Sequence, residues 1–252
     1  MVARDPALEE ALRRHLGQGL ELYAFQEADS TMETAHELAK KGAADGTLVF
    51  AARQTNGRGR LGRRWSSPEG GLYCSLIVRP TRPPVEIPQL SLVAGLAVAE
   101  ALHELTGLFP AIRWPNDVLV SNRKVCGILV EAKAGAAIIG IGVNVAAPLE
   151  ELPDTATSLA AQGATCDRFQ LTDLLYHRCM AWYEVWQREG FVPIREALRP
   201  RLGFFGHPVH ITTGATQFEG TAADLDDAGR LLVRLDSGIV RTFEVGEVTL
   251  LR

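Results

Sequence analysis

The sequence is poor in the residues that build disulfides and metal centres. It has four cysteines and six histidines in 252 residues, all scattered, and no Cys-x-x-Cys pair. This spacing favours buried thiols in a reducing compartment and no structural metal. We find neither the apolar core of a signal peptide at the N-terminus nor an apolar run of the roughly 18–20 residues that a membrane helix needs. The expected location is the cytoplasm, with no membrane partner.

Lysine is scarce as well, and positive charge is not in excess. The chain has four lysines, at positions 40, 41, 124 and 133, against 22 arginines. A formal net charge of −4 and a pI near 5.9 argue against a general nucleic-acid binder, because any basic surface must be local. The hydrophobic content of 46% and charged content of 22% fit one large globular domain, or one large and one small domain.

The motifs of the common covalent and metal-dependent mechanisms are also missing. The sequence has no nucleophile elbow, no Walker A motif, no His-Glu-x-x-His and no zinc-ligand spacing. A chain without them suits a reaction in which the substrates do the chemistry and the protein supplies position and charge. Nucleotidyl transfer to a carboxylate is such a reaction, and cations must screen the two anions that meet in it.

The most unusual stretch is the Gly-Arg loop (residues 57–65), in which three glycines and four arginines precede a tryptophan. Glycine lets a backbone approach a ligand closely, and the arginine fork suits phosphate and carboxylate. We therefore predict a loop that folds around a phosphate-bearing ligand and is mobile when empty. Predicted strands at 47–53 and 72–78 flank it, so it is not a dinucleotide-binding turn before a helix. The alternative is a solvated basic loop in contact with nucleic acid, which leaves the glycine spacing unexplained.

The first part of the chain predicts helices around these strands. A short helix is expected at 5–16. Ser30 and Glu33 have the spacing of a capping box in front of a helix that runs to about Lys41. An alanine- and leucine-rich helix at 89–105 carries few charges and should be largely buried.

The rest of the chain predicts a β-rich region, helices and a small β-domain. Residues 110–145 contain strands joined by hairpin-type links, so a mixed, mostly antiparallel sheet is expected. Residues 156–202 carry apolar residues near helical spacing and are predicted as helices. From residue 203, five short strands follow closely, which favours a small SH3-like barrel. The predicted fold class is α+β.

Polar groups accompany the strands predicted at 110–145. Asn116 and Asp117 follow a Trp-Pro pair, Lys124 opens a strand, and Asn144 ends one. Lys124 stands out because the chain uses arginine almost everywhere else, and a compact ammonium can move between a carboxylate and a phosphate. We therefore rank Lys124 first as the cation that screens two reacting anions. The alternative is a solvated hairpin lysine.

Taken together and in order, these motifs resemble those of biotin–protein ligases, also called biotin–[acetyl-CoA-carboxylase] ligases. The resemblance spans roughly residues 23–252. Its motifs are Asp-Ser30-Thr31, Gln54, Gly-Arg-Gly-Arg-Leu-Gly-Arg-Arg-Trp65, Arg113-Trp-Pro-Asn-Asp117, Lys124-x-x-Gly-Ile-Leu-x-Glu131 and Gly-x-Gly-Val-Asn144. It implies a class II synthetase-like catalytic domain at 23–203, between an N-terminal helical extension at 1–22 and an SH3-like barrel at 204–252.

The resemblance also implies a two-step reaction that uses biotin, ATP and Mg²⁺. The biotin carboxylate attacks the α-phosphate of ATP and gives biotinyl-5′-AMP and pyrophosphate. A lysine of biotin carboxyl carrier protein, or of another biotin-accepting domain, then takes the biotinyl group and releases AMP. A homodimer is implied as well. Because no winged helix-turn-helix fits before residue 20, we expect the monofunctional kind, with no nucleic-acid partner.

By the same resemblance, the motifs supply two binding sites. Lys124 would bridge carboxylate and α-phosphate, and Arg60 would retain the adenylate, so both are expected to be catalytic. The residues expected at biotin are Ser30, Thr31, Gln54, Arg58, Gly59, Arg60, Lys124 and Gly127. The residues expected at ATP or the adenylate are Arg58, Arg60, Arg63, Trp65, Asn116, Lys124 and Asn144. The protein itself is expected to hold no metal; Mg²⁺ would arrive with ATP, near Asp117, which is alternatively a contact for the acceptor lysine.

Three positions depart from the family pattern. Met32 stands in place of an asparagine, so a polar contact to biotin is missing or made elsewhere, while Leu61 and Arg113 stand in place of arginine and lysine. Two other functions stay open. A lipoate–protein ligase or octanoyl transferase would carry an Arg-Arg-x-Ser-Gly-Gly-Gly signature, which is absent. A biotin sensor on DNA would need a DNA-reading element, which we do not find.

Overall fold

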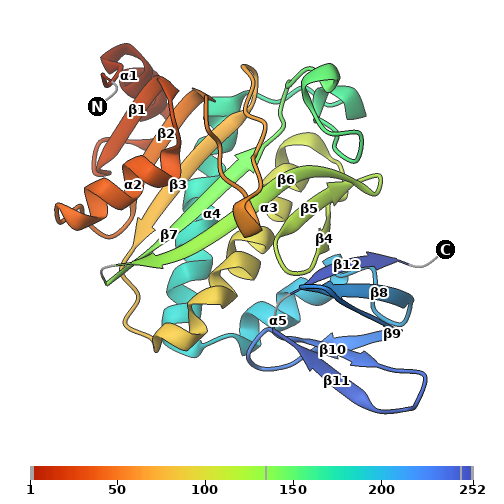
Figure 1. Cartoon of the computed structure of the whole chain (residues 1–252). Coiled ribbons are helices and arrows are strands. Elements are labelled where there is room, and N and C mark those ends of the chain that lie inside the picture. The colour runs from red at the N-terminus through yellow and green to blue at the C-terminus, as the bar shows by residue number, and fades with distance from the viewer. Residues whose placement is uncertain (1–2, 134, 245, 251–252) are drawn as a thin grey trace.

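Seven strands form the central sheet of the computed structural model, which describes residues 3–133, 135–244 and 246–250 (Figure 1). Their order is β1-β2-β3-β7-β6-β5-β4, with β1 and β2 parallel and all other neighbours antiparallel. The strands are β1 (Leu22–Ala28), β2 (Thr47–Gln54), β3 (Leu72–Val78), β4 (Ala111–Arg113), β5 (Asp117–Val120), β6 (Arg123–Lys133) and β7 (Ala136–Val143). The predicted mixed, mostly antiparallel sheet is confirmed.

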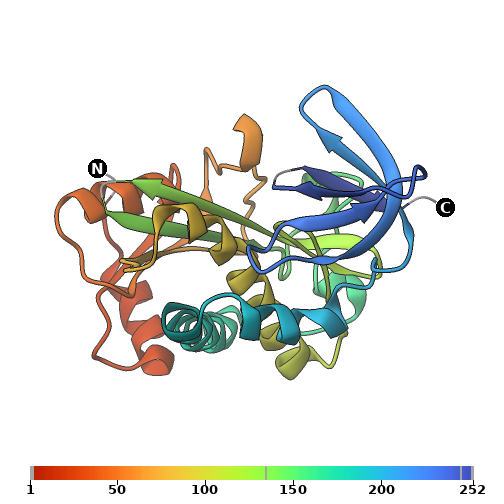
Figure 2. The same ribbon diagram turned by 90° about the horizontal axis from the view of Figure 1, so that it is seen from below.

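Helices cover the two faces of this sheet unequally. Three of them, α1, α3 and α4, pack in one apolar cluster on one face, whereas α2 packs in a second cluster on the other. Figure 2 shows the Gly-Arg loop rising from the face opposite α3 and α4. The helices are α1 (Pro6–Leu16), α2 (Thr31–Lys40), α3 (Leu90–Thr106), α4 (Arg168–Glu189) and α5 (Val192–Leu198), and 3₁₀ turns lie at Arg60–Gly62, Pro84–Gln89, Leu149–Glu151, Ala160–Gln162 and Arg199–Arg201.

The strand β2 illustrates how the sequence fills both faces. Its residues alternate between the clusters, because successive side chains of a strand point to opposite sides. Leu48 and Phe50 join α1, α3 and α4, whereas Val49 and Ala51 join α2. All four side chains are fully buried. The near-continuous apolar run of this strand therefore follows from having a helix layer on each side.

The helix α3 is buried along most of its length, as its low charge predicts. By length and composition, however, Pro84–Thr106 could cross a membrane, so the expectation that no apolar run is long enough is wrong. In the structure this segment packs against α4 and the central sheet, and 67% of its most apolar window is buried. Burial of this kind is what the core helix of a globular protein requires.

The five C-terminal strands form a second, antiparallel sheet beside the first (Figure 1). They are β8 (Pro208–Thr213), β9 (Thr216–Leu225), β10 (Leu231–Arg234), β11 (Val240–Phe243) and β12 (Glu247–Leu250). The predicted strands are confirmed. Their order is β11-β10-β9-β8-β12, so β11 and β12 are the edges. Because β12 pairs with β8 and not with β11, the five strands form a small open sheet within the described residues, where an SH3-like barrel is expected.

The two sheets share one apolar core. Val209 and Leu231 of the second sheet belong to the same buried cluster as α3 and α4. Buried Trp114 also donates a hydrogen bond from Nε1 to the Gly229 carbonyl, at 3.0 Å. The domain boundaries placed at residues 22 and 203 stay predictions.

The predicted capping box at the start of α2 is wrong. Ser30 is the N-cap residue, but its side chain makes no capping hydrogen bond. Its Oγ is buried without a partner in the described structure. The Glu33 carboxylate pairs with Arg58 of the Gly-Arg loop. Both side chains are thus directed toward the site described below.

The helical prediction for 156–202 is wrong at its N-terminal end. Residues before 168 form irregular chain and a short 3₁₀ turn, and the long helix α4 begins only at Arg168. The reason is a backbone pairing across the chain. The Lys124 amide donates to the Thr155 carbonyl at 3.0 Å, and the Thr157 amide donates to the Lys124 carbonyl at 2.9 Å. Residues 155–157 are therefore held in extended form beside the start of β6, where the sequence pattern predicts the beginning of a helix.

Candidate active site

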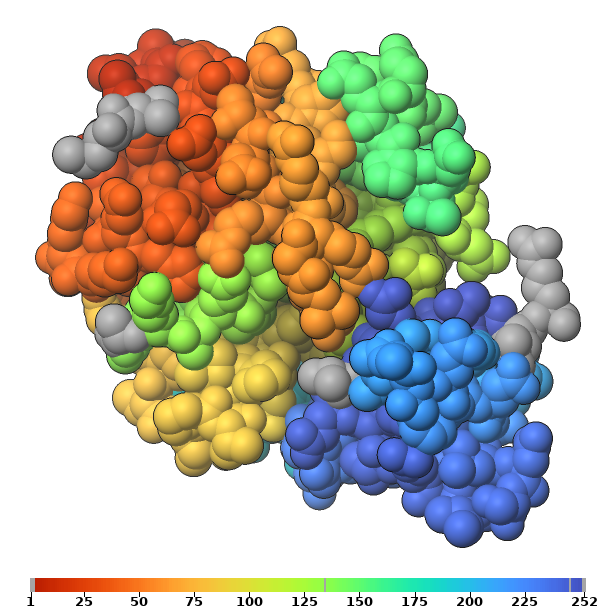
Figure 3. Space-filling view, in the orientation of Figure 1, coloured from red at the N-terminus to blue at the C-terminus, as the bar shows by residue number. Residues whose placement is uncertain are grey.

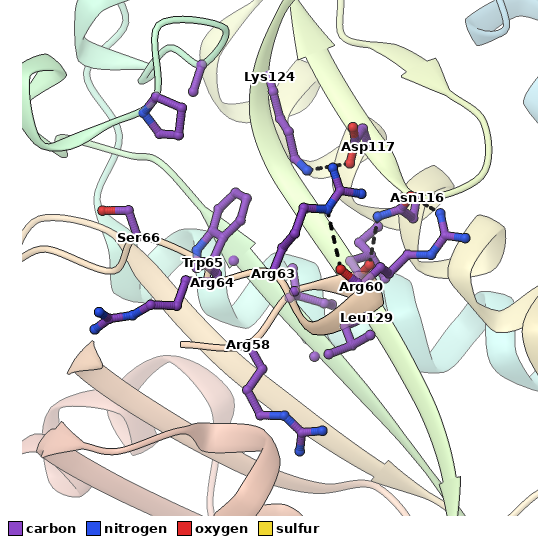
Figure 4. Close-up of a pocket in the computed structure, with 18 of the residues that line it drawn as sticks. Arg58, Arg60, Arg63, Arg64, Trp65, Ser66, Asn116, Asp117, Lys124 and Leu129 are labelled. Carbon is purple, nitrogen blue, oxygen red and sulfur yellow. Dashed lines mark hydrogen bonds and ion pairs between the residues drawn. The ribbon is translucent and has the colours of Figure 1, made fainter. Parts of the chain in front are cut away.

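A cavity of about 350 Å³ lies on the sheet face that carries α2. Strands β6 and β7 form its floor, the Gly-Arg loop lies across it, and β12 of the second sheet reaches its rim (Figures 3 and 4). Every residue assigned above to biotin, nucleotide or metal-bound nucleotide lines it: Ser30, Thr31, Gln54, Arg58, Gly59, Arg60, Arg63, Trp65, Asn116, Asp117, Lys124, Gly127 and Asn144. The structure brings these residues together, while their individual ligands stay predictions.

Two glycines of the floor make room for the Trp65 indole. A Cβ at Gly127 would lie 2.7 Å from Trp65 Cζ3, and a Cβ at Gly142 would collide with Nε1 of the same ring. Neither contact distance is tolerated by real side chains. The indole therefore rests directly on the sheet. The ammonium of Lys124 lies 5.2 Å from its centroid, within the range of a cation–π contact.

Lys124 and Asp117 are neighbours across the β5–β6 pairing. The Lys124 ammonium lies 2.5 Å from Asp117 Oδ1, as an ion pair outside hydrogen-bond alignment. The other carboxylate oxygen accepts a hydrogen bond from Arg113 Nη2 at 2.6 Å. Asp117 thus holds two cations at the cavity wall, and Arg113 keeps a charge at the position where the family has lysine. The Lys124 side chain is three-quarters buried, which strengthens the field of its charge toward an anion in the cavity.

Backbone hydrogen bonds close the Gly-Arg loop on itself. The Gly59 amide donates to the Arg63 carbonyl at 2.8 Å, and the Trp65 amide donates to the Gly57 carbonyl at 2.9 Å. The tip contains Leu61 in the left-handed region, with φ of 57° and its side chain 81% exposed. The loop is therefore a small hairpin with a strained tip over the cavity.

The arginines of this loop have separate partners. Arg60 Nη1 donates to Asn116 Oδ1 at 2.8 Å (Figure 4). Arg63 pairs with Glu247 of β12. Burial lowers the pKa of Arg60, while the nearby Asp117 carboxylate opposes that shift. Arg60 forms no ion pair with a carboxylate of the described residues, and a partly desolvated guanidinium of this kind gains most from a bound anion. Arg60 therefore fits the role predicted for it.

The opposite end of the cavity is lined by neutral polar groups. Gln54 Oε1 accepts from the Thr31 amide at 2.8 Å, and Gln54 Nε2 donates to Ser67 Oγ at 2.9 Å. Ser75 Oγ donates to Thr31 Oγ1 at 2.9 Å. The N-terminus of α2 and the end of β2 are thus tied together. A neutral ligand with donors and acceptors, such as a cyclic urea, suits this end better than a phosphate does.

Besides Asp117 Oδ1, which is paired with Lys124, three buried polar atoms of the lining residues have no hydrogen-bond partner in the described structure. They are Ser30 Oγ, Trp65 Nε1 and Asn144 Oδ1. Asn144 is fixed through its other side-chain atom, since Nδ2 donates to the Thr157 carbonyl at 3.0 Å. Unpartnered buried polar atoms are rare and costly, and those at a site are satisfied by water or ligand. We expect a ligand in this cavity to bond them.

Cys74 also lines the cavity, but it does not fit a covalent role. It is 1% exposed, and burial raises the pKa of its thiol to about 12. The thiolate is the nucleophilic form of cysteine, so this side chain stays protonated and inert near neutral pH. The cavity therefore offers cations and hydrogen-bonding groups for catalysis, as the lack of covalent motifs in the sequence predicts.

The described residues offer no ready-made metal centre. They contain no group of three or more His, Cys, Asp and Glu side chains placed to hold an ion. Two carboxylates line the cavity, Asp117 and Glu247, and both already pair with cations of the protein. Mg²⁺ prefers several oxygen ligands and often brings its own waters and substrate phosphates. The donor set fits an ion that is held mainly by a nucleotide.

Sequence reasoning missed several residues of this site. Gly142 and Gly140 were noted only as a pattern, although a Cβ at Gly140 would lie 2.9 Å from Met32 Cγ and closer to its sulfur. Ser75, Thr157 and Glu247 gave no local signal, because they come from segments far away in the sequence. Only the glycine spacing of β7 could have been interpreted as room for a ring above the sheet.

The chain matches known sequences along most of its length. The pattern of the Biotin/lipoate A/B protein ligase family matches residues 23–146, and that of the biotin protein ligase C-terminal domain matches 204–251. A biotin–[acetyl-CoA-carboxylase] ligase from Paracoccus denitrificans is 36% identical over 223 residues, which cover 83% of this chain and 92% of that protein. The chain belongs to the biotin protein ligase family.

Other members of this ligase family show how far the similarity extends. The bifunctional ligase/repressor BirA of Bacillus subtilis is 39% identical over 228 residues, covering 85% of this chain and 69% of that protein. The structure of biotin protein ligase from Aquifex aeolicus in complex with biotin and ATP has a TM-score of 0.81 and 34% identity. The match covers 92% of this chain and 99% of the Aquifex chain, so it includes both sheets.

Proposed function

We propose that this ligase activates biotin with ATP as biotinyl-5′-AMP and transfers it to a lysine of an acceptor protein. The observation that carries the proposal is the single cavity that unites a neutral polar end, at Ser30, Thr31 and Gln54, with a cationic end at Arg60 and Lys124. Biotin has the same polarity, with a cyclic urea at one end and a carboxylate at the other. The Aquifex relative, whose structure contains biotin and ATP, has the same fold.

In the first step, the carboxylate and the triphosphate must meet despite their like charges. Lys124 would lie between them and donate to both, while Arg60 holds the α-phosphate. The carboxylate oxygen bonds to the α-phosphorus, and the bond to the bridging oxygen of the β-phosphate breaks, releasing pyrophosphate. Cations fixed in a partly buried site lower the barrier of such a step, because they already lie beside the phosphate oxygens on which negative charge develops in the transition state. In this step the Lys124 ammonium must contact the substrates as well as the Asp117 carboxylate, with which it is paired in the structure.

In the second step, the acceptor amine attacks the carbonyl carbon of the mixed anhydride. An amide bond forms, the carbonyl–phosphate bond breaks, and AMP leaves with the bonding electron pair. The amine loses a proton in this step, and the Asp117 carboxylate is the acidic group of the cavity wall beside Lys124 that could accept it. The Gly-Arg loop would cover the adenylate and keep water away until the acceptor arrives.

We further propose biotin carboxyl carrier protein as the acceptor, Mg²⁺ as the ion that accompanies ATP, and a cytoplasmic homodimer. The acceptor is supported by the names of relatives such as the Paracoccus ligase. When bound, Mg²⁺ supplies neutralisation of the phosphate charges. The absence of nucleic-acid and membrane partners stays a prediction. Sedimentation of the purified protein with and without biotin tests the dimer.

The proposed reaction is tested by biotin-dependent exchange of pyrophosphate into ATP. We expect exchange with biotin and none with lipoate, and a bound mass equal to that of biotinyl-AMP after incubation with biotin, ATP and Mg²⁺. Exchange with lipoate but not with biotin would show a lipoate ligase of the same fold. The lipoate comparison is needed because the matching family includes lipoate ligases.

A further inference from the structure

One charged cluster beside the cavity has no part in the steps above. Glu131 of β6 accepts two hydrogen bonds, with Arg58 Nη2 at 2.7 Å from Oε1 and His36 Nε2 at 2.7 Å from Oε2. The same guanidinium lies 3.4 Å from Glu33 Oε2 through Nη1. Glu131 therefore joins three parts of the molecule: helix α2, strand β6 and the Gly-Arg loop.

The burial of these side chains decreases from the helix toward the loop. The side chain of His36 is 7% exposed, that of Glu131 is 29% exposed and that of Arg58 is 40% exposed. A carboxylate bonded on its inner side to a buried imidazole cannot turn freely, so its outer oxygen has a fixed place. Pairing Arg58 with such an oxygen costs less side-chain entropy than pairing two free surface side chains.

Arg58 is the point where this cluster meets the ligand site. It is the second residue of the Gly-Arg loop and lines the cavity, and its backbone pairs with Arg64 in an isolated bridge. Figure 4 shows its guanidinium pointing away from Lys124 and Asp117. Holding Arg58 therefore fixes the base of the loop and separates this charge from the other loop arginines.

We infer that Glu131 is a positioning residue for biotin, which acts through Arg58 and is itself held by His36. The inference rests on the proposed function, in which Arg58 belongs to the biotin end of the cavity. Glu131 touches no substrate in this scheme. Glu131 fixes the position of the Arg58 guanidinium before biotin binds. Removing the Glu131 carboxylate therefore lowers biotin affinity and leaves the chemistry at Lys124 unchanged.

The test compares Glu131→Gln with the wild-type chain by calorimetric biotin titration and by exchange kinetics. The amide keeps the shape and a bond to His36 but removes the charge that holds Arg58. We expect biotin affinity to fall about tenfold, as for loss of a charged hydrogen-bond partner, while kcat at saturating biotin stays within about twofold. The matched control is Glu104→Gln, which removes a carboxylate 2.7 Å from Arg178 on the helical face. This control should bind biotin as the wild type does.

A double-mutant cycle separates positioning from a general loss of structure. If Glu131 acts through Arg58, adding Glu131→Gln to Arg58→Ala causes no further loss of affinity, because the partner is already gone. His36→Gln, whose amide can donate to the same carboxylate, should retain affinity, and His36→Leu should lose part of it.

Three results overturn the inference: unchanged affinity in Glu131→Gln, a full additional loss in the Arg58→Ala background, or an equal fall in kcat. These are distinct from failure of the proposed function. If the wild-type chain does not bind biotin in the same titration, the proposed function itself is wrong.

Discussion

The floor and the cover of the cavity are built in opposite ways. The floor, on β6 and β7, is a continuous backbone ladder in which glycines replace side chains beneath Trp65. The cover, the Gly-Arg loop, is a hairpin with three backbone hydrogen bonds of its own and charged side chains that reach to Asn116, Glu131 and Glu247. The floor depends on buried, precise packing, and the cover on exposed, exchangeable pairs.

This difference separates two tasks within one site. Where glycines of the floor lie beneath Trp65, close packing tolerates no added atom, so the position of the ring is fixed. Ion pairs at a surface contribute little and can be exchanged for a ligand's charges. The floor therefore determines position, and the cover can open and close at low cost. The mutations below test that division, from the largest expected effect to the smallest.

Lys124 is the cation that β6 contributes to the cavity wall, and Lys124→Ala should have the largest effect. Loss of a fixed charge at the reacting groups lowers rates by roughly 10²–10³-fold, so biotin-dependent pyrophosphate exchange should fall by that amount. The control is Lys133→Ala, at the exposed end of the same strand. Exchange near the wild-type rate in Lys124→Ala, with a normal circular dichroism spectrum, would remove Lys124 from the mechanism.

Gly142→Ala tests whether the floor tolerates a single methyl group. The new Cβ would collide with the Trp65 ring, so we expect the free energy of unfolding to fall by about 1–3 kcal/mol and nucleotide affinity to weaken. Denaturant titration and ATP binding measure the two effects. Gly19→Ala is the matched control, since nothing lies within 4 Å of a Cβ there. If Gly142→Ala and Gly19→Ala have the same free energy of unfolding and the same ATP affinity, Trp65 is not held by the floor.

Arg60→Gly tests the part of the cover that faces the phosphates. Its guanidinium is partly desolvated and bonded only to a neutral amide oxygen among the described groups. A charge-assisted bond to phosphate is worth about 1.5–3 kcal/mol, so biotinyl-AMP should leave about tenfold faster or more. Released biotinyl-AMP reacts with lysines of other proteins, so the rate of release is measured as biotinylation of albumin added to the reaction. Unchanged selectivity would show that Arg60 does not retain the adenylate.

Glu247→Gln should have the smallest effect, because it breaks an exposed pair between the cover and β12. The side chains of Arg63 and Glu247 are 59% and 48% exposed, so we expect stability and ATP affinity to change by less than about 1 kcal/mol. The difference from wild type should shrink further in high salt. A large, salt-independent loss would mean that the second sheet is part of the floor and not a partner of the cover.

Much of the fold followed from local pattern. The apolar runs of β2 and β3, the helix α1 after Asp5 and the five C-terminal strands were all predicted within a few residues. Two errors have a common cause. Both predictions fail where a residue pairs with a distant segment of the site: Glu33 of the expected capping box pairs with Arg58, and the Thr157 amide pairs with Lys124.

The sequence by itself determined the chemistry of this protein: a glycine- and arginine-rich loop, a rare lysine at a strand start and the order of motifs that marks a biotin protein ligase. These are properties of residue type and spacing, so they can be recognised in the sequence alone. Only the tertiary structure decided that Gly142 supports Trp65, that Glu247 reaches the loop, and that Glu131 links His36 to Arg58. Such contacts join residues far apart in the sequence, 73 positions for Arg58 and Glu131 and 184 for Arg63 and Glu247. The folding of the central sheet brings the first pair together, and only the second requires the packing of the two sheets.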